Sequence, residues 1–411
     1  MSVTVIQDLR WGDTGKGKIS EHLSHPDRCD ISVRAVGGGN AGHVIVRGTR
    51  KIALHLLPAG CLHEGVDVVL GRGMVTHLPT LLRERQSVKD LFDTDPLNRL
   101  LIAPENAILF QGHKEADRAL ERRKGKDAVG TTGSGIGPAY ADKALRVGMR
   151  MEELLQPADH LKDRYRGLLN HWAATYGIGL DSTTQGEDID GLLRGKELLE
   201  SRIQDMTQYW QNAFGLDMRV VIEGAQGSLL SIDSEGYPYV TSSATTVNGH
   251  MQGAGIPHNY LTKVVGTLKA YDTRVGNGQM RTELPPDEAE ALQKKGGEFG
   301  STTGRGRRTG WLDLDDTAKR AWEEGVDELA VLKGDVLDDY ANISFATGGT
   351  AEDPSYSMLP GWHGSIRGLR HWDDLPEQAQ AMYDFIAKQT HIHRVTYIGT
   401  GPESNELIVR E

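Results

Sequence analysis

Cysteine is scarce in this sequence, and long apolar runs are absent. Only Cys29 and Cys61 occur among 411 residues, so neither a disulfide framework nor a cysteine metal site is expected. This usage favours a reducing, cytoplasmic setting. No run of about 18 apolar residues is present, so no membrane span is predicted. The first residues lead directly into a strand pattern, without the basic and apolar segments of a secretory signal.

Positive charge is also in deficit. The formal net charge is −11, because 57 Asp and Glu outnumber 46 Lys and Arg. General nucleic-acid binding needs a basic face, so nucleic acid is not an expected partner. An anionic small molecule would instead need Lys and Arg concentrated at a few places in the chain.

Glycine, in contrast, is frequent and clustered. Its 50 residues concentrate in five segments that also bear hydroxyl, amide or cationic side chains: 12–17, 36–43, 130–137, 224–227 and 300–306. Glycine costs backbone entropy, so clusters are expected where the chain needs a positive φ or approaches a ligand closely. Simple tight loops are the alternative. Several clusters follow predicted strands, and ligands of open parallel sheets bind beyond the strand ends, so we expect one shared site.

Strand-like apolar runs alternate with helical patterns along most of the chain. Strands are predicted over 3–9, 31–36, 52–57, 66–70, 100–103, 219–222, 264–270, 328–332 and 394–398, and helices over 78–91, 113–123, 159–176, 189–214, 312–324 and 376–389. The alternation predicts an α/β fold: a mainly parallel central sheet with helices on both faces. We expect a single domain over 1–411, with a helical subdomain inserted at about 150–214.

The loop at 12–18 follows the first predicted strand. Its glycines can expose backbone N–H groups to a phosphate, and its two lysines add positive charge, which predicts a P-loop-like nucleotide-binding core. The standard P-loop pattern is not met, since Arg10 replaces its first glycine and Gly17 follows the lysine. Asp13 is unfavourable beside phosphate unless it binds a metal or takes a proton. The loop therefore predicts chemistry as well as binding; a plain strand–helix turn is the alternative.

Three further segments suggest reacting or binding groups. Asn40 to His43 combines an amide, a close-approach backbone and an imidazole that could act as acid or base, or be structural. The loop at 300–308 has threonines and arginines suited to a dicarboxylate or phosphate, or it is a solvated basic loop. Lys333 and Asp335 follow a strand, where the lysine stem could cover a guanine and the carboxylate could accept its N–H groups.

Taken together, these segments resemble the adenylosuccinate synthetase family. The resemblance spans nearly the whole chain and rests on long motifs in the family's order: 11–18 (WGDTGKGK), 40–43 (NAGH), 130–140 (GTTGSGIGPAY), 223–227 (EGAQG), 237–243 (YPYVTSS), 302–305 (TTGR), 308–311 (RTGW) and 333–338 (KGDVLD). The resemblance implies a GTP-dependent ligase of purine biosynthesis that joins L-aspartate to C6 of IMP through a 6-phosphoryl intermediate, with Mg²⁺.

The resemblance also implies roles for individual residues. Asp13 would take the N1 proton and bind Mg²⁺ together with the Gly42 carbonyl, His43 would be the acid on the transferring phosphoryl group, and Lys16 would bind phosphate. Gln226 completes the catalytic set. The nucleotide substrate would contact Asn40, Thr132, Arg146, Gln226, Thr241, Val275 and Arg305, and aspartate would contact Thr302, Thr303, Arg305 and Arg307. GTP would contact Gly12, Gly15, Lys16, Gly17, Lys18, Lys333, Asp335, Gly399 and Gly401. Arg146 would reach the nucleotide of a second subunit, which implies a homodimer.

Several positions depart from the family pattern. Thr14 replaces the usual Glu, Ser134 replaces an Arg, Gly306 interrupts an arginine run, Gly39 replaces a His, and Gly399 replaces a Ser that helps to recognise guanine. We expect Thr14 to lie close to the purine. A branch of the family that uses dGMP has Ser-Thr where most members have Asp-Glu. This chain has Asp13-Thr14, so it shares the second of the two changes.

These departures leave alternatives open. One is a paralogue that acts on dGMP, with ATP as the possible donor, and another acts on a purine-analogue nucleotide. A nonenzymatic nucleotide-binding regulator is a more remote alternative, because Asp13, His43 and the aspartate loop are all present. A GTPase switch and a dinucleotide oxidoreductase are disfavoured, because their phosphate-loop patterns are missing.

Overall fold

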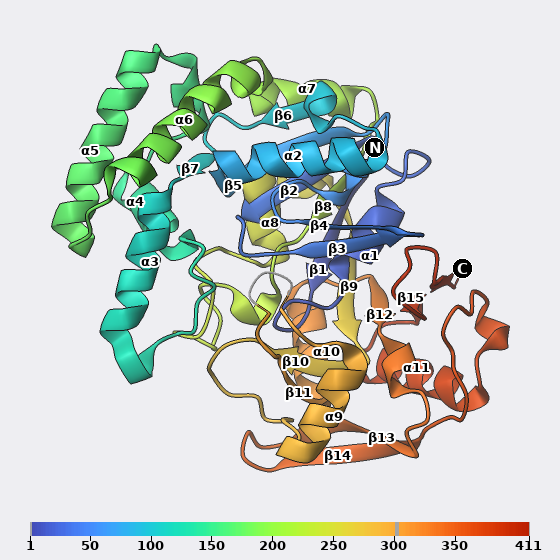
Figure 1. Cartoon of the computed structure of the whole chain (residues 1–411). Helices are drawn as coiled ribbons and strands as arrows, with labels where there is room; N and C mark the ends of the chain where they lie inside the picture. Colours follow the sequence, from blue (N-terminus) through green and yellow to red (C-terminus); the bar gives the residue numbers. More distant parts are fainter. Residues whose placement is uncertain (1, 301–303, 411) are drawn as a thin grey trace.

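A ten-stranded, mainly parallel sheet runs through the computed structural model, which describes residues 2–300 and 304–410 (Figure 1). Its main path is β16 (Leu407–Val409), β15 (Val395–Gly399), β12 (Glu328–Leu332), β9 (Leu261–Lys269), β1 (Ser2–Asp8), β8 (Arg219–Glu223), β2 (Ile31–Gly37), β5 (Asp67–His77) and β6 (Leu100–Ile102), and β7 (Ala107–Leu109) pairs with β5. The final strand, β16, pairs antiparallel with β15, and the other pairs in this sheet are parallel.

The central strands are buried on both faces. Val3, Val5 and Ile6 of β1 are fully buried, as are Val33 and Ala35 of β2. Such continuous burial is typical of parallel strands with helices on both sides. The helices packed around the sheet include α1 (Lys16–Leu23), α2 (Leu78–Phe92), α8 (Val247–Ala254) and α11 (Glu377–Gln389), whereas α10 (Leu314–Glu323) packs against α11 and a strand of a smaller sheet. The predicted fold class, an α/β protein with a mainly parallel sheet, is confirmed.

Two smaller sheets were not predicted. A four-stranded sheet has the order β10 (Tyr271–Arg274), β11 (Arg308–Asp313), β13 (Asn342–Gly349), β14 (Pro354–Pro360), and β3 (His43–Arg47) pairs with β4 (Arg50–Leu54) as a hairpin. The prediction of a helix over 312–324 is wrong at its start. Asp313 ends β11 in extended conformation and caps α10, its carboxylate accepting from Asp316 N.

Helices dominate the segment after the first half of the sheet. They are α3 (Gln111–Lys124), α4 (Ile136–Leu145), α5 (Ala158–Tyr176), α6 (Ser182–Leu199) and α7 (Met206–Gly215), and α9 (Pro286–Gly296) follows later. The prediction of a single helix over 189–214 is wrong. Helix α6 ends at Leu199, and α7 begins after Asp205, which caps it. Figure 1 shows α3, α5 and α6 projecting beyond one edge of the sheet.

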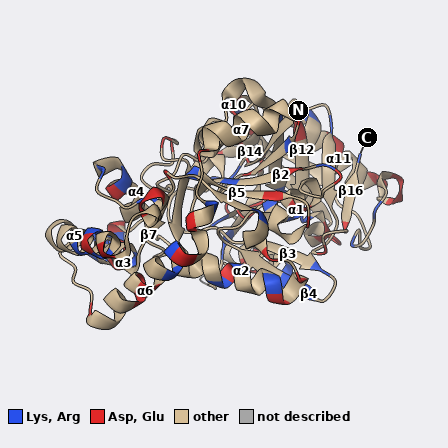
Figure 2. Ribbon diagram, turned by 90° about the horizontal axis from the view of Figure 1, so that it is seen from above, with Lys and Arg blue, Asp and Glu red and all other residues tan. Residues whose placement is uncertain are grey.

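Charge is mixed over this helical region. Figure 2 shows blue and red segments interspersed along α3, α5 and α6. In the described part of the chain, no helix has the length and apolar character needed to cross a membrane.

One buried carboxylate links three of these helices. Asp142 of α4 is fully buried and accepts from His113 Nε2 at 3.1 Å, His171 Nε2 at 3.0 Å, Trp172 Nε1 at 2.8 Å and the Tyr176 hydroxyl at 3.3 Å. Burial alone would raise the pKa of Asp142, but the hydrogen bonds from His113 and Trp172 outweigh it and hold the pKa below its usual value.

Asp142→Ala should therefore lower the free energy of unfolding by about 3 kcal/mol, because it leaves buried donors without a partner. The matched control is Asp163→Ala on α5, whose exposed ion pair with Arg166 should contribute less than about 1 kcal/mol. Denaturant unfolding of both variants measures the difference. Equal midpoints for the two would contradict a structural role for Asp142.

Candidate functional site

A cavity of about 780 Å³ opens where the parallel strands end. The segments that follow β1, β2, β8, β12 and β15 all contribute to its wall. Most of the residues singled out in the sequence line it: Gly12, Asp13, Gly15, Lys16, Gly17, Lys18, Asn40, Gly42, His43, Thr132, Gln226, Thr241, Val275, Arg307, Lys333, Asp335, Gly399 and Gly401. Segments far apart in sequence thus meet at one place, as strand ends of an open parallel sheet allow.

The loop after β1 presents its backbone to this cavity. Gly15 caps α1 with φ 89°, and a Cβ there would lie 2.5 Å from Leu332 Cδ1, so only glycine fits. The N-terminal N–H groups of α1 follow at once, and they are suited to an anion. Lys16 is buried in this loop, and its Nζ lies 2.8 Å from Asp8 Oδ2.

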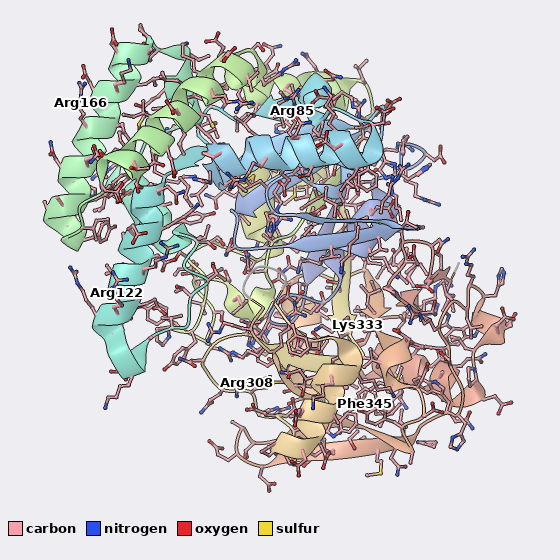
Figure 3. All side chains as sticks on the ribbon, viewed as in Figure 1. Arg85, Arg122, Arg166, Arg308, Lys333 and Phe345 are labelled. Atoms are coloured by element: carbon pink, nitrogen blue, oxygen red, sulfur yellow. The ribbon has the colours of Figure 1, made fainter. Side chains whose placement is uncertain are left out.

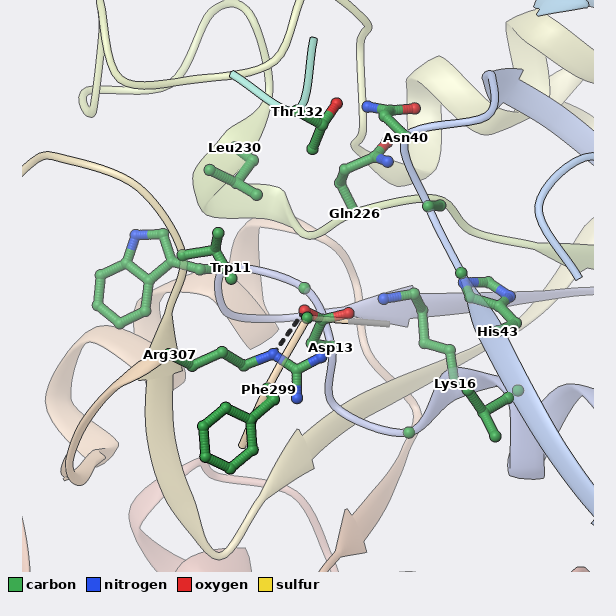
Figure 4. Close-up of a pocket in the computed structure, with 18 of the residues that line it drawn as sticks. Trp11, Asp13, Lys16, Asn40, His43, Thr132, Gln226, Leu230, Phe299 and Arg307 are labelled. Carbon is green, nitrogen blue, oxygen red and sulfur yellow. Dashed lines mark ion pairs between the residues drawn. The ribbon is translucent and has the colours of Figure 1, made fainter. Parts of the chain in front are cut away.

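Asp13 is held by an arginine from the other side of the cavity. Its backbone has φ 56°, and its carboxylate is 36% exposed. Arg307 Nε lies 2.9 Å from Asp13 Oδ2, as the dashed line in Figure 4 marks. Arg307, which is predicted to bind aspartate, therefore neutralises the charge of Asp13, the predicted base.

The side chain of Thr14, a residue that we expected close to the purine, points away from the cavity. Thr14 is only 2% exposed and does not line the cavity. Its hydroxyl donates to Asp8 Oδ2 at 2.5 Å and lies 2.9 Å from Thr267 Oγ1, beneath the loop. Asp8 also accepts from Lys16, so a small hydroxyl at position 14 shares this buried carboxylate. Thr14 in place of the usual Glu therefore changes the contacts beneath the loop at 12–18 and not the cavity wall.

His43 is hydrogen-bonded to a buried carboxylate, that of Glu223. Its Nδ1 bonds to Glu223 Oε1 and lies 3.0 Å from Arg34 Nη1, which leaves Nε2 as the nitrogen for the cavity. Burial, followed by Arg34, lowers the pKa of His43 to about 4, against the opposing effect of Glu223. Burial would raise the pKa of Glu223, but His43 and Arg34 lower it to about 2. The imidazole is thus neutral near pH 7.

The wall opposite His43 has amide and hydroxyl groups. Asn40 Nδ2 lies 3.5 Å from Thr241 Oγ1, and the Thr132 hydroxyl donates to Ser134 at 2.9 Å. Gln226 has φ 53°, and neither its Oε1 nor its Nε2 has a hydrogen-bond partner among the described residues, although both atoms are buried. An unpaired buried amide is costly, so a polar ligand group at this wall would satisfy it. Figure 4 shows Asn40, Thr132 and Gln226 gathered above Asp13 and His43.

The far end of the cavity contains Lys333 and Asp335. Lys333 has φ 58°, and its Nζ donates to Gly296 O at 2.6 Å and to Glu298 Oε1 at 2.9 Å. Burial, with a smaller effect of Asp338, raises the pKa of Asp335 above its usual value. Neighbouring Gly399 has no room for a side chain, because a Cβ would lie 2.6 Å from Leu332 Cδ2.

Lys18 connects the first loop to the loop after β15. Its Nζ donates to the carbonyl oxygens of Gly401 and Glu406, the latter at 3.1 Å. Burial lowers the pKa of Lys18 to about 8, with Glu406 opposing the shift.

Two predicted site residues that the structure describes, Arg146 and Arg305, lie outside the cavity lining. Arg146 is exposed at the end of α4, beside a separate hollow of about 160 Å³ that it lines with Lys143 and Arg150. Arg305 is exposed and donates to Gly130 O at 3.3 Å, near the cavity but outside its lining. Thr302 and Thr303 lie outside the described residues.

Two supporting carboxylates were missed by sequence reasoning. Glu223 begins the quoted motif at 223–227, so its place at the end of a strand could have drawn attention to it. Glu298, which contacts both Arg307 and Lys333, stands in an unremarked stretch after α9. No local pattern distinguishes it from an exposed loop glutamate.

The family model described as adenylosuccinate synthetase matches residues 5–408. An adenylosuccinate synthetase from Salinibacter ruber is 37% identical over 99% of this chain and 98% of that protein. One from Chlorobium chlorochromatii is 38% identical over 99% of this chain and 97% of that protein.

Two solved structures are also similar. The fully ligated adenylosuccinate synthetase from Plasmodium falciparum has a TM-score of 0.94 and 35% identity, and each chain is covered in full (100%). A succinoaminodeoxyadenylate synthetase of cyanophage S-2L, bound to dGMP and dATP, has a TM-score of 0.64 and 21% identity, covering 99% of this chain and 95% of that one. The second likeness extends to the fold alone.

Acid should destabilise this protein through its buried histidines. Burial is the main cause that lowers the pKa of His43 to about 4 and of His250 to about 3, from 6.5. Below pH 6.5 the unfolded chain therefore binds protons that the folded chain does not, so the free energy of unfolding should fall as pH drops from 6.5 toward 4.

The variant His250→Gln isolates one contribution, since neither imidazole nitrogen of His250 has a partner among the described residues. The plot of unfolding free energy against pH should become shallower in this variant. His160→Gln, at an exposed position on α5, is the matched control and should keep the wild-type slope. An unchanged slope in His250→Gln would refute the assigned proton linkage.

Proposed function

Because this chain belongs to the adenylosuccinate synthetase family, we propose how its own residues carry out the family's reaction. The chain is a carbon–nitrogen ligase of purine biosynthesis that joins the amine of L-aspartate to C6 of IMP and uses GTP. The products are adenylosuccinate, GDP and phosphate. The supporting observation is one cavity that combines a phosphate loop, Asp13, His43 and Arg307.

The first step needs O6 of the purine to become a nucleophile. Asp13, which reaches into the cavity from the phosphate loop, takes the N1 proton, and the negative charge then moves to O6. O6 attacks the γ-phosphorus of GTP, whose bond to the β-phosphate oxygen breaks. The backbone of the loop at 12–18 and Lys16 position the phosphates, because phosphoryl transfer depends mainly on position and charge neutralisation.

His43 would donate a hydrogen bond or proton to the transferring group from Nε2. Glu223 fixes the ring through Nδ1, and Arg34 holds Glu223 at 2.7 Å. An incoming phosphate would stabilise the imidazolium and raise the lowered pKa of His43, so the acid would form only with substrate present.

The residues present fit Mg²⁺. Among residues 2–300 and 304–410, no group of three His, Cys, Asp or Glu side chains forms a metal cage. Mg²⁺ commonly uses one or two carboxylates plus substrate phosphates, and Asp13 supplies a carboxylate beside the phosphate loop. Asp13 and the Gly42 carbonyl would hold the ion, which would neutralise charge on the phosphates.

Aspartate then displaces the phosphate at C6. Arg307 would bind a carboxylate of aspartate, with Thr302, Thr303 and Arg305 completing the site as the family resemblance implies. Phosphorylation makes the oxygen at C6 a good leaving group, so the amine forms the new C–N bond as phosphate departs. Because Arg307 pairs with Asp13, a shift of Arg307 to the carboxylate of aspartate would also free the base.

IMP and GTP are favoured over dGMP and ATP. The relatives that share 35–38% identity are adenylosuccinate synthetases, whereas the dGMP-bound protein shares 21%. Asp335, at the far end of the cavity, supports guanine, since its carboxylate can accept from N1–H and the 2-amino group. Gly399 would supply only backbone there.

We further propose a homodimer that works in the cytoplasm. Arg146, exposed beside Lys143 and Arg150, would reach the 5′-phosphate of the other subunit's nucleotide. The two cysteines are free and buried, which agrees with a reducing compartment.

Asp13→Ala should abolish ligation and leave the fold intact. Loss of the base and of a Mg²⁺ ligand should lower kcat by at least about 100-fold. The carboxylate is partly exposed, so the unfolding midpoint should change little. Aspartate-dependent phosphate release and circular dichroism measure both. Near-normal turnover would reject the role of Asp13.

Mixing two inactive variants tests the shared site. Arg146→Leu and Asp13→Ala place their defects in different parts of a dimer, so hybrid dimers should contain one intact site and regain up to about half of the wild-type activity per hybrid. Mass spectrometry should establish that hybrids form. Hybrids without activity would show that Arg146 does not act across the interface.

A further inference from the structure

Glu298 is a buried carboxylate beneath the cavity, between α9 and β11. Its side chain is fully buried and is surrounded by cations. Glu298 Oε2 lies 2.9 Å from Lys269 Nζ and 2.6 Å from Arg307 Nη1, and Oε1 accepts from Lys333 at 2.9 Å and from the Tyr271 hydroxyl at 2.6 Å. Each carboxylate oxygen thus has two polar partners.

Two of these partners, Arg307 and Lys333, also line the cavity. Arg307 continues to Asp13 on the phosphate loop. Lys333 stands next to the segment assigned to guanine and is 34% exposed. Figure 3 shows Lys333 at the centre of the fold, where it stands apart from outlying residues such as Arg122 and Arg166. Glu298 is therefore the central member of a chain of ion pairs that runs Asp13, Arg307, Glu298, Lys333.

The electrostatics of this chain are asymmetric. Three cations surround one carboxylate, and although burial acts in the opposite direction, Lys269, Lys333 and Arg307 lower the pKa of Glu298 far below its usual value. Burial lowers the pKa of Lys269 to about 8, with Glu298 opposing. Lys269 holds the Glu298 carboxylate in place, because Lys269 is itself buried and also donates to Thr273.

We propose that Glu298 is a positioning residue that sets the place of Lys333 for the guanine of GTP and of Arg307 for aspartate and Asp13. This proposal rests on the proposed function for the two ligands that it names. Lysine and arginine side chains have many rotamers, so a fixed counter-charge lowers the entropy lost when each binds its ligand. Without Glu298, Asp13 would be the one carboxylate partner left to Arg307 among the described residues, and Lys333 would lose one of its two hydrogen bonds there, keeping the bond to Gly296 O.

Glu298→Gln tests this role, because it keeps the shape and removes the charge. We expect Kd for GTP, measured by calorimetry without other substrates, and KM for aspartate each to rise at least tenfold. KM for IMP should stay within about twofold. The matched control is Glu324→Gln, a buried glutamate outside the cavity that accepts from Val247 N. It should leave all three constants unchanged.

A double-mutant cycle traces the path through Lys333. In a Lys333→Ala background, Glu298→Gln should no longer weaken GTP but should still weaken aspartate. If the loss of charge leaves Lys269 unpaired and the variant fails to fold, Lys269→Met/Glu298→Gln removes both buried charges and should show the same two defects. A purely structural Glu298 would lower the unfolding midpoint and leave Kd for GTP and KM for aspartate unchanged, which would overturn the proposal.

Failure of this proposal can be distinguished from failure of the proposed function. Kd for GTP needs no turnover, so a change in the substrate of the reaction would not hide the effect on Lys333. An equal loss of GTP affinity with and without Lys333 would also overturn the assigned path.

Discussion

The ion pair between Asp13 and Arg307 is the interaction that brings the parts of this site together. A carboxylate on a loop built to attract phosphate is unfavourable unless something compensates its charge. In this structure, an arginine that also pairs with buried Glu298 provides that compensation. Substrates would replace it, with aspartate taking Arg307 and the purine N1 and Mg²⁺ taking Asp13.

Much of the fold and the site could be predicted, because the informative patterns are local. The run at 3–9 and the loop at 12–18 follow each other in sequence, so a strand and a phosphate loop are both readable there. The convergence of distant glycine clusters followed from one rule, that parallel strands end at the same edge. This rule brings Asn40, Gln226 and Lys333 to a single cavity.

The remaining features depend on contacts between distant segments. Thr14 was expected at the purine, but it turns inward because Asp8 and Thr267 offer its hydroxyl buried partners. Glu298 has no distinguishing neighbours in sequence, and its importance comes from Lys269, Arg307 and Lys333, which fold around it. The helix predicted from residue 312 begins two residues late, because residues 312 and 313 end the strand Arg308–Asp313, whose pairing with β10 and β13 leaves no local sign in the sequence.

The central claim is that this cavity uses GTP to couple aspartate to IMP. The most direct measurement is aspartate-dependent phosphate release, with the nucleotide product identified by mass, over IMP, GMP, dGMP and dIMP against GTP, ATP and dATP. The account predicts adenylosuccinate and phosphate in equal amounts, with the highest kcat/KM for IMP and GTP. Preferred turnover of dGMP with ATP or dATP, or phosphate release without adenylosuccinate, would contradict it.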